Sequence, residues 1–174
     1  MKKLLPIAFC LLALPAAAHP GHAEAAGLMA GLAHPFSGLD HLLAMVGVGL
    51  WSRRQTHGVW LAPAFVLMMA IGALVLPGSP FEPGLAASVA LIGLLLVTRQ
   101  RLPAVAGFAL VSGFALLHGQ AHGSELPQAA SAAGFLLSSA ALLLAGRALG
   151  AERVARLAGA AIAATGLFLL ASVA

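Results

Sequence analysis

Residues 28–51, LMAGLAHPFSGLDHLLAMVGVGLW, indicate the fold class of this chain. It is long enough to cross a bilayer, because a transmembrane helix needs about 20 mostly apolar residues. A carboxylate at the centre of such a helix costs roughly 2.5 to 3.5 kcal/mol on insertion scales, and ionisable residues there usually mark a site. Asp40, flanked by His34 and His41, therefore predicts a membrane helix that carries function.

The composition of the whole chain agrees with a membrane protein. Of its 174 residues, 61% are hydrophobic and 8% are charged, and the mean hydropathy is +1.00. These values exclude a soluble globular domain and predict a polytopic membrane protein with the lipid bilayer as its partner. The formal net charge is +4, but the basic residues lie in short loops between apolar runs. Such residues set orientation in a membrane, so no nucleic-acid partner is predicted.

Residues 1–18 have the pattern of a secretory signal peptide. Lys2 and Lys3 precede the apolar run 4–14, and Ala16-Ala17-Ala18 provides a small-residue cleavage site. A short uncleaved anchor is the alternative. Because Cys10 lies in this segment, a mature chain of residues 19–174 would have no disulfide and no thiolate ligand. We expect those residues to form a single transmembrane domain.

Punctuation by Pro, Gly and Arg divides the mature chain into apolar stretches, which predict an all-α bundle of six transmembrane helices. The predicted spans are residues 28–51, 59–76, 85–97, 103–118, 128–149 and 154–174. Every arginine follows an odd-numbered span or lies between spans five and six, which makes that side cytoplasmic. The expected location is a bacterial inner membrane, with both mature termini periplasmic. Three spans in each half would also permit a 3+3 inverted repeat.

The first polar cluster lies in span one. His34 and His41 are seven residues apart, so two turns of one continuous helix would place them on one face, with Asp40 slightly off it. Pro35 removes a helical hydrogen bond to the carbonyl of Gly31. We therefore expect a single bent helix with polar groups facing inward.

The second polar cluster lies at the end of span four. His118 and His122 have i,i+4 spacing, and Glu125 lies three residues beyond, so all three share a face if the helix continues. The alternative is that Gly119 and Gly123 unwind this end. Two imidazoles and a carboxylate are a common ligand set for nickel, cobalt, zinc, iron or manganese. Buried hydrogen bonds between helices are the competing explanation, but structural contacts rarely need so many titratable groups.

Three further residues are weaker candidates. Cleavage after Ala18 would expose His19 and His22 beside a free α-amine, a set that can capture a divalent cation or simply form a polar end. Glu82 lies where span three begins, and either caps that helix or acts as an outer metal ligand.

The N-terminal pattern, the motif HPFSGLDHLLAMVGVG at residues 34–49 and the motif LLHGQAHGSE at residues 116–125 together resemble the HupE/UreJ family of hydrogenase and urease accessory membrane proteins. The resemblance covers essentially the whole mature chain. It implies a permease for nickel, and in some members cobalt, that serves nickel enzymes. The residues it implies as handling the metal are His34, Asp40, His41, His118, His122 and Glu125, with Glu82 at an acidic family position.

The predicted function is therefore import of a divalent metal, nickel first and then cobalt, from periplasm to cytoplasm for the maturation of a hydrogenase or urease. No enzymatic activity and no catalytic cofactor are predicted, and the ion bound or carried is Ni²⁺, with Co²⁺ and Zn²⁺ chemically admissible. Nickel-enzyme maturation proteins and a second copy of the chain are the expected protein partners. Two alternatives stay open, an intramembrane zinc-dependent hydrolase and a metal-binding accessory protein without transport.

Overall fold

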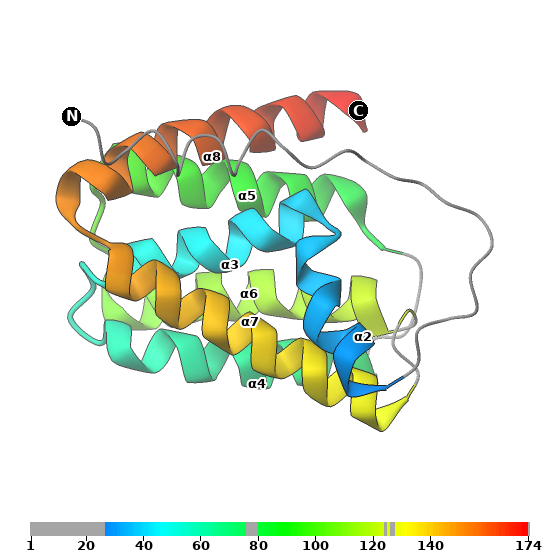
Figure 1. Ribbon diagram of the computed structural model, residues 1–174. Helices are drawn as coiled ribbons and strands as arrows, with labels where there is room; N and C mark the ends of the chain where they lie inside the picture. The colour runs from blue at the N-terminus through cyan, green and yellow to red at the C-terminus, as the bar shows by residue number, and fades with distance from the viewer. Residues whose placement is uncertain (1–26, 76–79, 124, 126–127, 174) are drawn as a thin grey trace, which may run out of the picture.

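The computed structural model describes residues 27–75, 80–123, 125 and 128–173, and the regular structure in these ranges is entirely helical (Figure 1). This confirms the predicted all-α class. The predicted signal peptide, residues 1–18, lies outside the described residues. The elements are α2 Leu28–Ala33, η1 His34–Phe36, α3 Leu39–Ser52, η2 Gly58–Trp60, α4 Leu61–Val75, α5 Glu82–Val97, α6 Ala104–Gly123, α7 Ala129–Leu149 and α8 Glu152–Ser172.

Several of these helices have the length and composition of membrane spans. Within the described ranges, four helical stretches qualify: Gly58–Val75, Ala104–Gly123, Ala129–Leu149 and Glu152–Ser172. The helices α3 and α5 are apolar but shorter, with 14 and 16 residues. An apolar chain favours helices in lipid because a helix satisfies its own backbone hydrogen bonds there. The chain is thus a helical protein of membrane type.

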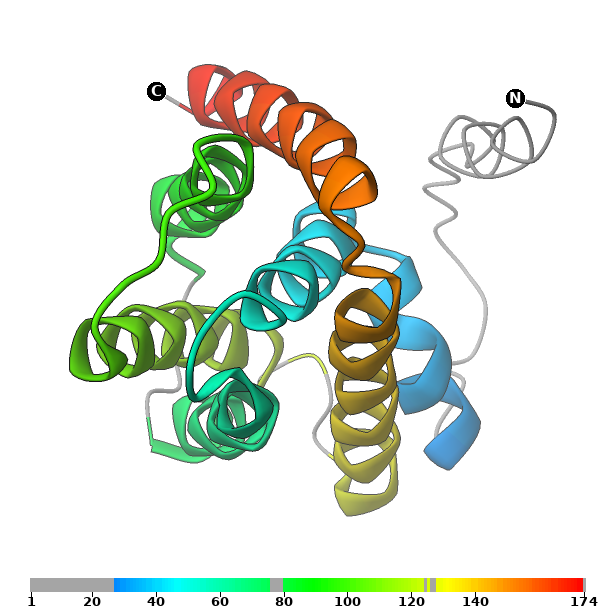
Figure 2. The same cartoon turned by 90° about the vertical axis from the view of Figure 1, so that its left-hand side faces the viewer.

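The first predicted span is interrupted, so the single bent helix expected over residues 28–51 is wrong. Helix α2 ends at Ala33, the 3₁₀ turn η1 follows, and Gly38 adopts an extended conformation with φ −105° and ψ 117° before α3 begins. Pro35 cannot donate a backbone hydrogen bond, which favours a break over a continuous helix. Figure 2 shows α2 running at a steep angle to α3.

Helix pairs that are distant in sequence form the bundle. Helix α3 packs against α7 and α5, α4 packs against α6, α5 packs against α8, and α2 lies on α7. The closest approaches occur at small residues, as is usual between membrane helices. At Gly93 of α5, for example, an added Cβ would lie 2.6 Å from the Cα of Ala163 in α8. The centre of the bundle is filled by large apolar side chains, including the fully buried Trp51 and Phe65.

The two ends of the bundle differ in chemistry. At the end where α3 stops and α4 starts, Arg147 donates to the carbonyl oxygen of Ser52 at 2.8 Å, and Arg99 forms an ion pair with Glu152. The indole of Trp51 donates to the carbonyl oxygen of Gln100 at 3.0 Å, which connects the end of α3 to the segment between α5 and α6. The opposite end holds α2, η1 and the last turn of α6, and therefore both predicted polar clusters.

Candidate metal centre

The two predicted polar clusters meet around one side chain, His122. Its ring centroid lies 4.9 Å from that of His34 and 4.8 Å from that of His41. The two histidines of the first motif reach it from η1 and from α3, on either side of the break at Gly38. The spacing predicted that these two histidines lie on one face of a continuous helix. Instead, the break in the helix brings them together.

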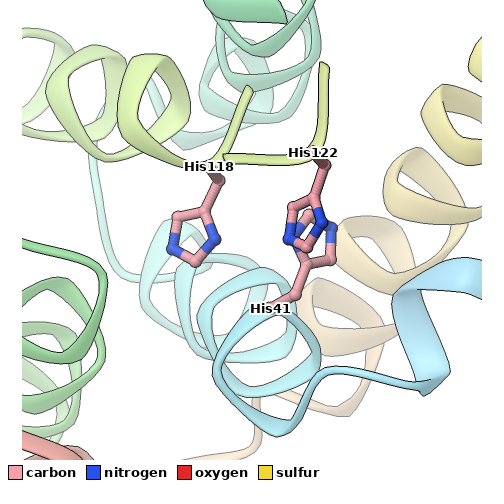
Figure 3. Close-up of side chains that lie close together, drawn as sticks. All are labelled: His41, His118 and His122. Atoms are coloured by element: carbon pink, nitrogen blue, oxygen red, sulfur yellow. The ribbon is translucent and has the colours of Figure 1, made fainter. Parts of the chain in front are cut away.

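An inner cluster consists of His41, His118 and His122 (Figure 3). One ring nitrogen from each lies within 4.8 Å of one from each of the others. Helix α6 continues to Gly123, so His118 and His122 share a helical face and unwinding at Gly119 is not observed. Glu125 lies in a turn beyond the end of this helix, so the predicted shared face does not include it. The side chains of His41 and His118 are 0% exposed. A metal with bonds of about 2.0 to 2.1 Å to nitrogen would draw these three nitrogens closer together.

Three nitrogens of the inner cluster are unsatisfied. Nδ1 of His41, Nδ1 of His118 and Nε2 of His122 are buried and have no hydrogen-bond partner among the described residues. A buried polar atom left without a partner costs about 1 to 3 kcal/mol, so such atoms rarely occur together without a reason. Three nitrogen atoms arranged in this way are suitable ligands for a cation.

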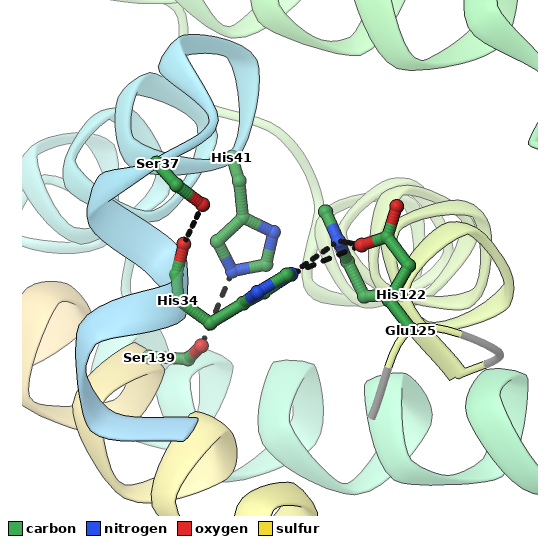
Figure 4. Close-up of polar contacts among 6 residues, drawn as sticks. All are labelled: His34, Ser37, His41, His122, Glu125 and Ser139. Carbon is green, nitrogen blue, oxygen red and sulfur yellow. Dashed lines mark hydrogen bonds and ion pairs between the residues drawn. The ribbon is translucent and has the colours of Figure 1, made fainter. Parts of the chain in front are cut away.

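An outer cluster consists of His34, His122 and Glu125 (Figure 4). Oε2 of Glu125 lies 2.7 Å from Nδ1 of His122 and 3.0 Å from Nε2 of His34, and these two nitrogens are 3.0 Å apart. The Glu125 side chain is 50% exposed and that of His34 is 21% exposed. This cluster is therefore open to the end of the bundle and offers a mixed set of nitrogen and oxygen ligands.

Two serines that the sequence reasoning missed hold the inner histidines. Ser88 of α5 donates its hydroxyl proton to the carbonyl oxygen of Leu85 at 2.7 Å, so its oxygen accepts from Nε2–H of His118 at 3.1 Å. Neutral imidazole has one N–H and one lone pair, which leaves the lone pair of His118 on Nδ1. Ser139 of α7 lies 3.2 Å from Nε2 of His41.

Residue spacing in the sequence does not indicate that Ser88 and Ser139 contact these histidines, because each serine lies on a different helix from its partner. A serine in an apolar helix most often bonds to a carbonyl of the preceding turn, and Ser88 does so as well. Phe135 was also missed, although its ring centroid lies 4.7 Å from that of His41 and 5.3 Å from that of His122. It packs against the histidines and restricts their orientation.

Asp40 and Glu82 belong to neither cluster, but both line a cavity that also borders His122 and Glu125. A cavity of about 260 Å³ is bounded by Asp40, Glu82, His122 and Glu125, among other residues. Glu82 is the first residue of α5, where its charge also interacts favourably with the helix dipole. Carboxylates that line a cavity raise the local concentration of cations. The assignment of Asp40 and Glu82 as ligands stays a prediction, and the candidates His19 and His22 lie outside the described residues.

This fold and centre define a class: a helical protein of membrane type with a buried group of histidines beneath an acidic cavity. Residues 7–169 match the model of the family described as HupE / UreJ protein, so the chain belongs to that family and the resemblance seen in its motifs is confirmed. The chain is 44% identical over 130 residues to Protein HupE of Rhizobium leguminosarum bv. viciae. The aligned region covers 70% of this chain and 67% of that relative.

No solved structure matches this chain. The family is associated with hydrogenase and urease accessory function and is not a known catalytic family.

Proposed function

We propose that this chain is a permease that carries a divalent metal ion, nickel before cobalt, from the periplasm to the cytoplasm for maturation of a nickel hydrogenase or urease. The observation that carries the proposal is the set of three buried, unpartnered histidine nitrogens beneath the acidic cavity. Imidazole donors suit nickel, cobalt and zinc and select against magnesium and calcium, which prefer oxygen. Family membership favours nickel within that group.

The proposed membrane arrangement has six crossings, in which α2 and α3 together form the first. The arginine-rich end would face the cytoplasm, and the metal centre and both mature termini would face the periplasm of a bacterial inner membrane, after cleavage of the signal peptide. The packing also supports a 3+3 inverted repeat, because α3 on α7 and α6 on α4 are equivalent pairs when the halves are exchanged.

The route of the ion would start in the cavity between Asp40 and Glu82 and continue through the outer and inner clusters. An inside-negative potential favours inward movement of a divalent ion by roughly 4.6 kcal/mol per 100 mV, which is twice the value for a single charge. Partial sites suit transport because each must bind strongly enough to replace water and weakly enough to release. Binding displaces protons from imidazole, so we expect uptake to fall as the medium is acidified.

The first test is uptake of radiolabelled nickel by the wild type and by an Asp40→Ala variant at matched membrane levels. We expect uptake to fall to background in the variant, because the cavity beside His122 loses one of the carboxylates that line it. His57→Ala is the matched control, since His57 is exposed at the opposite end of the bundle. Cobalt, zinc and manganese as competitors would rank selectivity.

Wild-type uptake in a well-inserted Asp40→Ala variant would remove Asp40 from the route. If the wild type itself shows no uptake but retains a metal on purification, the protein is a metal-binding accessory protein or a hydrolase and not a permease. The nickel-enzyme maturation proteins are the partners that the permease function implies.

Ser88 is proposed as a positioning residue for His118, and its loss is expected to weaken Ni²⁺ binding about 10- to 100-fold, the range typical for groups that orient a metal ligand. Ser88→Ala removes the acceptor for Nε2–H of His118. Ser88→Thr keeps the hydroxyl and should restore affinity. Equilibrium dialysis measures affinity, and the absorption spectrum of bound Co²⁺ reports ligand geometry, which a purely structural role would leave unchanged.

The control for this prediction is Ser138→Ala. The hydroxyl of Ser138 is buried as well, but it donates to carbonyls of its own helix at Gly134 and Phe135. If Ser88→Ala and Ser138→Ala alter nickel affinity equally, Ser88 has no specific role in the centre.

A further inference from the structure

His122 belongs to both clusters, and the two clusters use different sides of its ring. Nδ1 faces the outer cluster, 2.7 Å from Oε2 of Glu125 and 3.0 Å from Nε2 of His34. Nε2 is buried and unpartnered among the described residues, as are Nδ1 of His41 and Nδ1 of His118. The other ring nitrogen of each histidine already contacts Ser139, Ser88 or Glu125. The three unpartnered nitrogens are therefore the ones available to the inner cluster.

A neutral His122 ring cannot serve as a ligand in both clusters at one time. A neutral imidazole carries one N–H and one lone pair, and only the lone pair binds a metal. The short contact of Nδ1 with Oε2 of Glu125 suits a ring that carries its proton on Nδ1 and its lone pair on Nε2. In this form the ring can complete the inner cluster. For Nδ1 to bind a metal instead, the proton must leave Nδ1 and reside on Nε2.

We propose that His122 is a shared ligand that passes one divalent ion between the outer and the inner cluster, so that the two clusters are filled in alternation and never together. The ring that binds in the outer cluster carries its proton on Nε2, and the ring that binds in the inner cluster carries it on Nδ1, so the number of protons on the ring is the same in both states. The inward direction rests on the proposed permease function, whereas alternate filling rests on the geometry alone. Sharing one ligand also keeps either site from becoming a closed, tightly retaining shell.

The test is the number of Co²⁺ ions bound per chain at saturation, measured by equilibrium dialysis on the purified full-length chain without a polyhistidine tag. All variants carry His19→Ala and His22→Ala, which removes the other candidate ligands near the N-terminus. His118→Asn impairs the inner cluster and Glu125→Gln impairs the outer one. His57→Asn controls for the loss of a histidine outside both clusters.

Alternate filling predicts one ion per chain in the parent, one in each single variant with a different Co²⁺ spectrum in each, and none in the double variant. Two ions per chain in the parent would overturn the proposal, since both clusters would then be filled together. Loss of all binding in either single variant would overturn it as well, because only one site would exist. His41→Asn and His34→Asn provide second variants of the inner and outer clusters if either first variant fails to fold.

Flux of Ni²⁺ into proteoliposomes that contain the same parent separates this inference from the proposed function. If each chain binds one ion, the two single variants differ in their Co²⁺ spectra and no flux is seen, the shared ligand is supported and the permease is rejected. Flux with two ions bound per chain supports the permease and rejects alternate filling.

Discussion

Replacing His122 by alanine is expected to abolish nickel uptake and to weaken nickel binding by at least about 100-fold, since loss of a ligand should exceed the loss of a group that only orients one. His122 is the residue that the two clusters have in common. Its removal leaves His41 with His118 in one cluster and His34 with Glu125 in the other, and two ligands hold a divalent ion poorly. Every other single substitution in the centre leaves one cluster intact.

This prediction is checked by nickel uptake in cells and by equilibrium dialysis on the purified variant. His57→Ala, at the opposite end of the bundle, should retain both activities. Nickel affinity of His122→Ala within a few-fold of the wild type would show that His122 is not a ligand in either cluster.

The second large effect is expected for Gly119→Ala, a change of one methyl group between His118 and His122. A Cβ at Gly119 would overlap the backbone carbonyl oxygen of Met69 in α4 and would lie 2.9 Å from the backbone nitrogen of Ala73. Backbone atoms cannot rotate away, so α4 and α6 must separate. Overpacking of this kind typically costs about 1 to 3 kcal/mol, and here it also displaces two ligands of the inner cluster.

The matched control lies in the same helix. Gly113 has no atom within 4 Å of an added Cβ among the described residues, so Gly113→Ala should lower neither stability nor nickel binding. We expect Gly119→Ala to lower the midpoint of thermal unfolding in lipid nanodiscs and to reduce nickel affinity, whereas Gly113→Ala does neither. Equal midpoints for the two variants would mean that α4 and α6 do not cross closely at Gly119.

The interruption of the first span shows why periodicity alone misplaced two side chains. The seven-residue spacing of His34 and His41 indicated one face of one helix, but Pro35 and Gly38 end that helix between them. His34 nevertheless reaches His122, because α2 is held against α7 by close contact of Gly31 with the backbone at Ser131. His41 reaches it separately, from the first turn of α3. The structure brings together the histidines that the motifs singled out, but across a break in the helix that periodicity does not predict.

The helical class and most of the candidate residues could be predicted from the amino-acid sequence. Both follow from one physical fact, since apolar stretches of this length favour helices in lipid and ionisable side chains are costly there. The division into two clusters, His34 with Glu125 and His41 with His118, both sharing His122, is visible only in the folded structure. The structure also revealed Ser88 as the partner of His118. Periodicity tells which residues share a face of one helix, whereas the contacts that divide ligands and assign ring nitrogens depend on which helices cross and how closely.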